Sequence, residues 1–214
     1  MSMDATHRVS GFVCGTALST QRSGRIGKLR CGQTRPSRVV IVPNNQYTIS
    51  SAKAWYSWLK DEVSLDVEVA ESFPNPYDAN TKRWERVWLN YMRDELKIDS
   101  STIAIGHGSG ADALLRFLEN YPAYGSILIA PGDEYHAGER HGRPHHWVDI
   151  RRNCLHFIEH IYSIDDGFVT EGESRFVASQ LKAKALELRG RGRLSDSQFP
   201  EVKTILTAHL QSLN

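Results

Sequence analysis

The strongest constraint on the fold is a glycine-rich turn in the middle of the chain, placed between a strand and a helix. Residues 101–105 form a short apolar run that predicts a buried strand, and residues 111–118 carry apolar side chains at helical spacing. The turn between them reads Gly106, His107, Gly108, Ser109 and Gly110. Such a tight connection predicts a parallel sheet whose two faces are covered by helices.

The apolar patterns elsewhere in the chain alternate in the same way. Further strands are predicted at 39–42, 65–69 and 126–130. Helices are predicted where apolar residues recur every three or four positions, at 55–63, 84–96, 176–188 and 199–213. Residues 147–161 are predicted to form a helix followed by a strand. The fold class is therefore α/β, a three-layer sandwich with a mostly parallel sheet of about six strands.

Residues 1–38 differ in composition from the remainder of the chain. They contain seven basic residues and one acidic residue, a net charge of +6, so residues 39–214 carry −5 of the total of +1. The segment is rich in Ser, Thr and Gly and has no continuous apolar stretch, as is typical of an organellar transit peptide. We predict a basic arm or transit-like segment at 1–38, a folded domain at 39–214 and a mitochondrial location. A disordered arm on a cytoplasmic protein is the alternative.

Membrane and disulfide architectures are not expected. No apolar run approaches the roughly 20 residues that a membrane helix requires, so no membrane span is predicted. Cys14, Cys31 and Cys154 are scattered along the chain, without the spacing of a disulfide framework or a zinc site. They indicate a reducing compartment.

A cluster of histidines and one glutamate could in principle bind a metal ion. It consists of His136, Glu139, His141, His145 and His146. The spacing differs from that of a helical His-Glu-x-x-His pair, in which both imidazoles lie on one helix face. We predict exposed loop side chains that face solvent or a partner, and we predict neither a metal nor a cofactor.

Two chemistries place glycines at a strand-to-helix turn. Gly106, Gly108 and Ala111 fit the spacing of a dinucleotide-binding turn, but no acidic residue follows at the next strand, which makes this a weak match. The second is the nucleophile elbow, Gly-x-Ser-x-Gly, in which a strained turn holds a catalytic serine above the sheet. The residue at its centre is Gly108.

Several ordered stretches make the chain resemble the retinoblastoma-binding protein 9 family of small serine hydrolases, which have a small, lidless α/β-hydrolase fold. The stretches are Val40–Pro43, Ala54–Trp58, Phe73–Pro76 with Trp88, Ile105–Ala111, Arg143–Trp147 with Asn153 and Cys154, and Ser163–Phe168. The resemblance runs from about Val39 to the C-terminus.

The resemblance also implies which catalytic positions have changed. The family's elbow reads Gly-His-Ser-Ser-Gly-Ala, so its nucleophile corresponds to Gly108, and its acid corresponds to Asp166, which is retained. Its histidine corresponds to Arg193, whose guanidinium stays protonated and cannot act as a base. Its glycine-rich loop after the first strand, which resembles an oxyanion-hole element, reads Asn44–Tyr47 here.

No obvious substitute restores the triad. The only histidine after Asp166 is His209, which lies on the apolar stripe of the last helix and is predicted to pack in the core. Ser109 is the nearest replacement nucleophile, but in elbow geometry its backbone N–H would face the oxyanion and its side chain would point elsewhere.

We therefore predict a catalytically inactive member of the family that serves as a scaffold or accessory subunit of a larger mitochondrial assembly. Partner contacts are predicted at a glycine-flexible loop that contains Arg189, Arg191 and Arg193, which could grip an acidic protein or phosphate. One alternative is a serine hydrolase of small esters or amides with a displaced triad. Another is a subunit that contacts RNA through the arm and this loop.

Overall fold

A six-stranded parallel sheet forms the middle layer of the protein. The computed structural model describes residues 35–44, 55–71, 84–132 and 144–212. The strand order is β2-β1-β3-β4-β5-β6, and every neighbouring pair is parallel. The strands are β1 (Arg38–Val42), β2 (Asp66–Val69), β3 (Thr102–His107), β4 (Ala123–Ile129), β5 (Cys154–Ser163) and β6 (Lys184–Leu188). The predicted fold class and strand number are confirmed.

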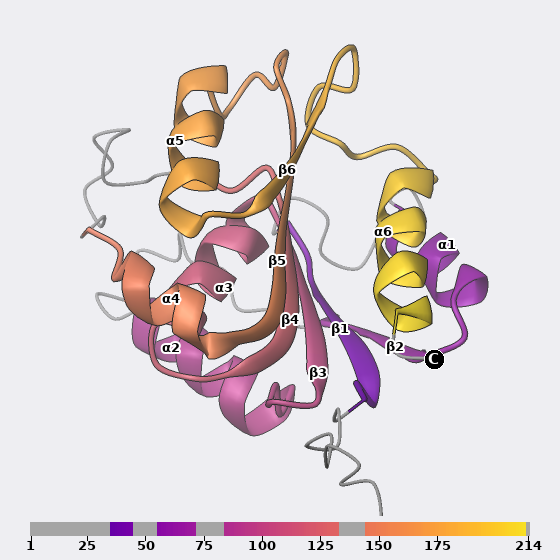
Figure 1. The fold of residues 1–214 in the computed structure, drawn as a ribbon, viewed down its shortest axis with the longest axis vertical. Helices are drawn as coiled ribbons and strands as arrows, with labels where there is room; N and C mark the ends of the chain where they lie inside the picture. Colours follow the sequence, from indigo (N-terminus) through magenta and orange to yellow (C-terminus); the bar gives the residue numbers. More distant parts are fainter. Residues whose placement is uncertain (1–34, 45–54, 72–83, 133–143, 213–214) are drawn as a thin grey trace, which may run out of the picture. The chain divides into compact units, whose positions relative to one another are not determined.

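Helices cover both faces of this sheet, as Figure 1 shows. One face is covered by α2 (Trp84–Asn90), a π-helical turn η3 (Tyr91–Glu95), α3 (Ser109–Leu118), α4 (Trp147–Asn153) and α5 (Glu171–Leu181). The other face is covered by α1 (Trp55–Glu62) and α6 (Pro200–Gln211). Because both faces of the sheet are covered, two apolar cores form, one on each side of the central strands.

The central strands are apolar throughout because no face of them meets water. All residues of β3 and β4 are buried, and so are four of the five residues of β1. The register pairs Val42 with Gly106 and His107 with Ile129, so the carboxyl ends of β1, β3 and β4 lie at the same edge of the sheet. This is the edge at which α/β proteins place their functional loops.

One predicted helix is partly wrong. Residues 176–188 were predicted as a single helix, but α5 ends at Leu181 and residues 184–188 form strand β6. Lys182 adopts a left-handed conformation at φ 52°, which ends α5, and β6 then pairs along β5 from Lys184 to Leu188. The Lys, Ala, Leu and Glu residues of β6 favour a helix locally, but pairing with the neighbouring strand overrides this preference.

The predicted arm lies almost entirely outside the described residues. The described residues all belong to a compact unit that spans Gln33–Asn214. The domain boundary at residue 38, the transit-like role and the mitochondrial location therefore stay predictions. Within the described ranges, none of the helices has the length and apolar character needed to cross a bilayer.

Gly110 provides a test of the tight packing between α3 and β1. A Cβ at this position would lie 2.2 Å from the carbonyl oxygen of Val42 and 2.5 Å from that of Pro43, and backbone atoms have little freedom to shift. We expect Gly110→Ala to lower the free energy of unfolding by about 3 kcal/mol. Urea denaturation measures this loss.

Gly172 is the matched control because it is an exposed glycine in α5. The nearest atom to its added Cβ would be Thr170 Oγ1 at 4.0 Å. Gly172→Ala should leave stability unchanged or raise it by about 0.5–1 kcal/mol, because alanine favours the helix. Equal losses in the two variants would contradict the close approach at Gly110.

Candidate active site

The turn after β3 has the backbone geometry of a nucleophile elbow. Gly108 adopts φ 53° and ψ −123°, and α3 begins at the next residue. The Gly108 N–H donates to the carbonyl of Ile129 at 2.9 Å, and its own carbonyl accepts from the N–H groups of Ala111 and Asp112 at 2.8 and 3.0 Å. A residue with a side chain is strained at this φ, whereas glycine adopts it freely. The predicted turn is therefore present, with glycine at its centre.

A second loop brings Arg193 to this elbow. The carboxylate of Asp165, just after β5, accepts hydrogen bonds from the N–H groups of Gly190 at 2.9 Å and Gly192 at 3.2 Å. Trp55 Nε1 donates to the carbonyl of Leu194 at 3.1 Å. These bonds hold the loop on both sides of Arg193, so the position of its side chain is set by the backbone.

The structure brings together the three positions that the family resemblance assigns to the triad. Arg193 Nη1 lies 3.3 and 3.2 Å from the two carboxylate oxygens of Asp166, whose side chain is only 1% exposed. A Cβ placed on Gly108 would lie 2.9 Å from Arg193 Nη2. Asp166 Oδ1 also accepts from the N–H of Phe168 at 2.8 Å, and the guanidinium carbon lies 4.8 Å from the centre of the Phe168 ring. The guanidinium thus stands between the acid and the elbow, where the family's histidine is expected.

Asn44 and Ser109 complete the described part of the site. Asn44 is buried just beyond β1, and its Nδ2 lies 2.9 Å from the position of a Cβ on Gly108. The Ser109 hydroxyl donates to Asn44 Oδ1 at 3.2 Å. The Ser109 hydroxyl and the elbow position thus contact the same amide group, and the expectation that the Ser109 side chain points away from the oxyanion stays a prediction. Residues 45–47 of the predicted oxyanion loop lie outside the described residues.

His107 links the elbow to the Arg193 loop, which the sequence did not reveal. Its Nε2 lies 2.8 Å from the carbonyl oxygen of Arg193, and its Nδ1 lies 2.7 Å from the Tyr56 hydroxyl. A carbonyl only accepts, so Nε2 carries the proton and Nδ1 accepts from the hydroxyl. The Tyr56 hydroxyl in turn accepts from the Asn44 N–H at 3.2 Å. The only signal in the sequence was a histidine at the end of an otherwise apolar strand.

The other histidines lie apart from this constellation. His209 was predicted to pack in the core; its side chain is 26% exposed, its Nε2 lies within hydrogen-bond distance of Oε1 of the buried Glu159 at 2.8 Å, and its ring stacks on Phe157 at 3.6 Å. His145, predicted to be exposed, is buried and lies 3.1 Å from Glu119 Oε1.

His145 differs from the prediction because Glu119 and Arg116 are also buried and form an ion pair at 2.9 Å. His136, Glu139 and His141 lie outside the described residues. Within the described ranges no group of three or more potential metal ligands comes together.

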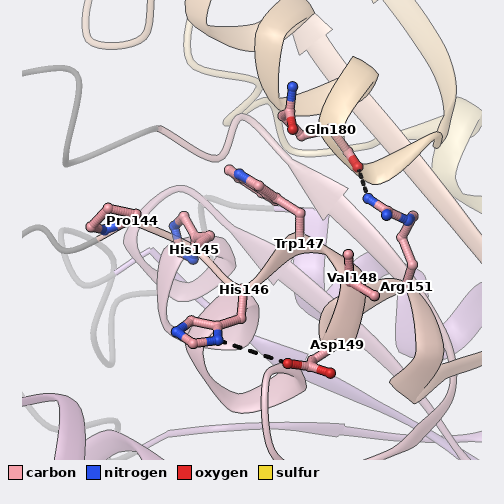
Figure 2. A pocket seen from close by; sticks show the side chains of 8 residues that line it. All are labelled: Pro144, His145, His146, Trp147, Val148, Asp149, Arg151 and Gln180. Carbon is pink, nitrogen blue, oxygen red and sulfur yellow. Dashed lines mark hydrogen bonds and ion pairs between the residues drawn. The ribbon is translucent and has the colours of Figure 1, made fainter.

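A pocket of about 400 Å³ lies between α4 and α5 (Figure 2). Trp147 points toward α5 in this view, and His146 faces Asp149 across 3.8 Å. At the far side of the pocket, Arg151 donates a hydrogen bond to the carbonyl oxygen of Gln180. None of the residues that line this pocket belongs to the elbow constellation.

The arginines predicted to contact a partner already form ion pairs within the protein. Arg191 forms ion pairs with Asp196 and Glu201, both at 2.7 Å, and Arg193 pairs with Asp166. Arg189 has the most exposed side chain of the three, at 76%. Contacts of this loop with protein partners or RNA stay predictions.

Comparisons with known proteins identify the class. The solved structure of the YdeN gene product of Bacillus subtilis matches with a TM-score of 0.66 at 20% identity, covering 82% of this chain and 99% of that one. A predicted CIB-like hydrolase from Thermoplasma acidophilum matches with a TM-score of 0.60 at 15% identity, covering 84% and 88%. These likenesses show an α/β-hydrolase fold.

Sequence comparison then gives the family. The serine hydrolase family model matches residues 39–208. The chain is 34% identical to the serine hydrolase RBBP9 of Rattus norvegicus over 188 residues, which cover 82% of this chain and 98% of that protein. It is 27% identical over 183 residues to the putative hydrolase YdeN of Bacillus subtilis, covering 76% and 92%. The chain belongs to the serine hydrolase family, and the predicted resemblance is confirmed.

Family membership corrects the predicted function. A catalytically inactive scaffold or accessory subunit is contradicted, because the relatives above are named as a serine hydrolase and a putative hydrolase. The alternative, a serine hydrolase of small esters or amides, fits these findings better. The prediction failed because it inferred a loss of catalytic activity from the residues found at the predicted triad positions.

Burial of His107 makes the stability of the protein sensitive to acid. Burial lowers the pKa of His107 from 6.5 to about 4. The folded protein then binds one proton fewer than the unfolded chain between these values. The stabilising contribution is present above pH 6.5 and is lost as the pH falls toward 4, by about 3 kcal/mol at most.

We expect His107→Gln to flatten the fall of unfolding free energy between pH 6.5 and 4, because Gln does not titrate. Urea denaturation at half-unit pH steps measures the slope. Burial lowers the pKa of His160 to about 3, so His160 contributes part of the pH dependence of the unfolding free energy in both the unmodified protein and His107→Gln. His146→Gln is the control, since that side chain is 65% exposed. An unchanged slope in His107→Gln would contradict a buried neutral His107.

Proposed function

We propose that this protein hydrolyses small esters or amides by acyl transfer to Ser109. The supporting observation is that the Ser109 hydroxyl and the elbow position contact the same Asn44 amide group. The hydroxyl therefore lies one residue along the chain from the family's nucleophile position and beside the same polar groups. Membership of the serine hydrolase family supports this class of reaction.

The neighbouring groups have defined roles in such a reaction. Ser109 Oγ attacks the carbonyl carbon, and the carbonyl oxygen gains negative charge in the tetrahedral intermediate. Arg193 Nη2 and Asn44 Nδ2 both approach the elbow and can donate hydrogen bonds to that oxygen. The carbon–oxygen or carbon–nitrogen bond then breaks as the leaving alcohol or amine takes a proton from water, and a second water releases the acid from Ser109.

The Ser109 hydroxyl donates its hydrogen bond to Asn44 Oδ1 and not to a histidine. Both ring nitrogens of His107 are hydrogen-bonded, to Tyr56 and to the Arg193 carbonyl, and His209 is paired with Glu159. We expect hydroxide from solvent to take the Ser109 proton. The reaction should accordingly be slow, and its rate should rise about tenfold per pH unit between pH 7 and 9 rather than follow a bell-shaped profile.

Labelling with a fluorophosphonate probe tests this proposal. We expect slow covalent labelling of the intact protein at Ser109, identified by peptide mass spectrometry, and none in Ser109→Ala. Ser179→Ala is the matched control, because Ser179 is an exposed serine on α5. Arg193→Gln should slow labelling by about 100-fold, as expected for the loss of one oxyanion donor.

A double variant tests whether the elbow itself is competent. Gly108→Ser with Arg193→His restores the hydroxyl and imidazole beside the retained Asp166. We expect labelling faster than in the unmodified protein by about 100-fold or more, through general-base catalysis. Strain at the positive φ of residue 108 should lower its stability by about 1–3 kcal/mol. If the double variant is labelled and the unmodified protein is not, the elbow is intact and Ser109 is not the nucleophile.

A further inference from the structure

The guanidinium of Arg193 has one nitrogen paired with Asp166 and one buried nitrogen without a hydrogen-bond partner among the described residues. Nη1 pairs with Asp166 at 3.3 and 3.2 Å. Nε is buried and has no hydrogen-bond partner in the part of the chain that the structure describes. Nη2 lies 2.9 Å from the position of a Cβ on Gly108, so this nitrogen approaches the elbow.

The edge of the guanidinium formed by Nε and Nη2 has a specific chemical complement. The N–H of Nε and the nearer N–H of Nη2 point in the same direction and form a planar fork. A carboxylate presents two oxygens at matching separation and accepts both bonds at once. A buried donor without a partner is unfavourable, and a carboxylate would satisfy it.

Two further features favour an anion at the same place. Asn44 Nδ2 lies 2.9 Å from the same Cβ position on Gly108 and adds an amide donor beside the fork. Helix α3 is ten residues long and begins at Ser109, so the positive end of its dipole lies at the elbow. The absence of a side chain at residue 108 leaves these donors next to one another.

Phe168 indicates what kind of acid fits. Its ring lies 4.8 Å from the guanidinium carbon of Arg193, and the residue is 66% exposed. It supports the plane of the fork and presents apolar surface to solvent beside it. We propose that the elbow binds the carboxylate of a small monocarboxylic acid through the Nε and Nη2 fork of Arg193 and Asn44, with its apolar substituent near Phe168.

This proposal does not depend on acylation of Ser109, because the fork is formed by Arg193 alone. Asp166 already compensates the charge of Arg193, so selectivity arises from fork geometry more than from net charge. The site should therefore prefer propionate to chloride at the same ionic strength.

Titration of the full chain with sodium propionate tests the site. Sodium chloride keeps the ionic strength constant, and the Arg side-chain Nε–H signals are followed by ¹⁵N NMR. We expect saturable binding that shifts the signal of Arg193, which is assigned by its loss in Arg193→Lys. Arg193→Lys keeps a positive charge for Asp166 but lacks the fork, so it should bind propionate at least tenfold more weakly.

Arg189→Gln is the matched control on the same loop, and its affinity should stay within twofold of the unmodified protein. Arg193→Gln should lose binding as Arg193→Lys does, and circular dichroism establishes that each variant is folded. Propionate shifts that do not saturate, or equal affinity in Arg193→Lys, would overturn the proposal. Ser109→Ala separates the two proposals, because it should abolish probe labelling and retain saturable propionate binding at the Arg193 fork, even though the Asn44 amide loses the hydrogen bond that it accepts from Ser109.

Discussion

The hydrogen bond from His107 to the carbonyl of Arg193 joins the two parts of the molecule that make the site. His107 ends β3, whereas Arg193 lies 86 positions further along the chain, in the loop between β6 and α6. Tyr56 fixes the ring from its other side and also receives the N–H of Asn44. Because His107, Tyr56 and Asn44 are buried, breaking one of these bonds would leave a polar group without a partner and away from water. One neutral imidazole thus links β3 to the loop that carries Arg193 and, through Tyr56, to Asn44.

The ion pair between Arg193 and Asp166 explains why the acid is retained beside a changed histidine position. Asp166 is buried, and its Oδ1 also accepts from the N–H groups of Phe168 and Val169. A buried carboxylate that loses its partner is destabilising by about 3–5 kcal/mol, and arginine supplies a permanent counter-charge where histidine would supply a titrating one. The presence of Asp166 is thus accounted for by folding alone, and it is no evidence for or against a catalytic role.

Sequence patterns predicted those features that are set locally. The elbow followed from its glycines, and the parallel sheet followed from alternating strands and helices. Strand β6 was missed because its residues favour a helix, and only pairing with β5 decides otherwise. Burial of His145 depends on Glu119, which lies 26 positions earlier in the chain, so no local pattern could reveal it. The orientation of Ser109 depends in the same way on Asn44. The family resemblance predicted which positions correspond to the triad, but not what their neighbours do.

The changes at residues 108 and 193 are physically coupled. A serine at 108 would bring its Cβ within 2.9 Å of both Arg193 Nη2 and Asn44 Nδ2, so it fits only if these flexible ends move. A histidine at 193 would be shorter and would lack the contact of the guanidinium with the elbow. Each single replacement therefore disturbs contacts made by the residue at the other position. The losses of unfolding free energy in the two single variants should accordingly not add. A double-mutant cycle on unfolding free energy should give a coupling of about 1 kcal/mol or more between these positions, with the double variant more stable than the two single losses imply. Additive losses would mean that Arg193 moves away from residue 108 without cost.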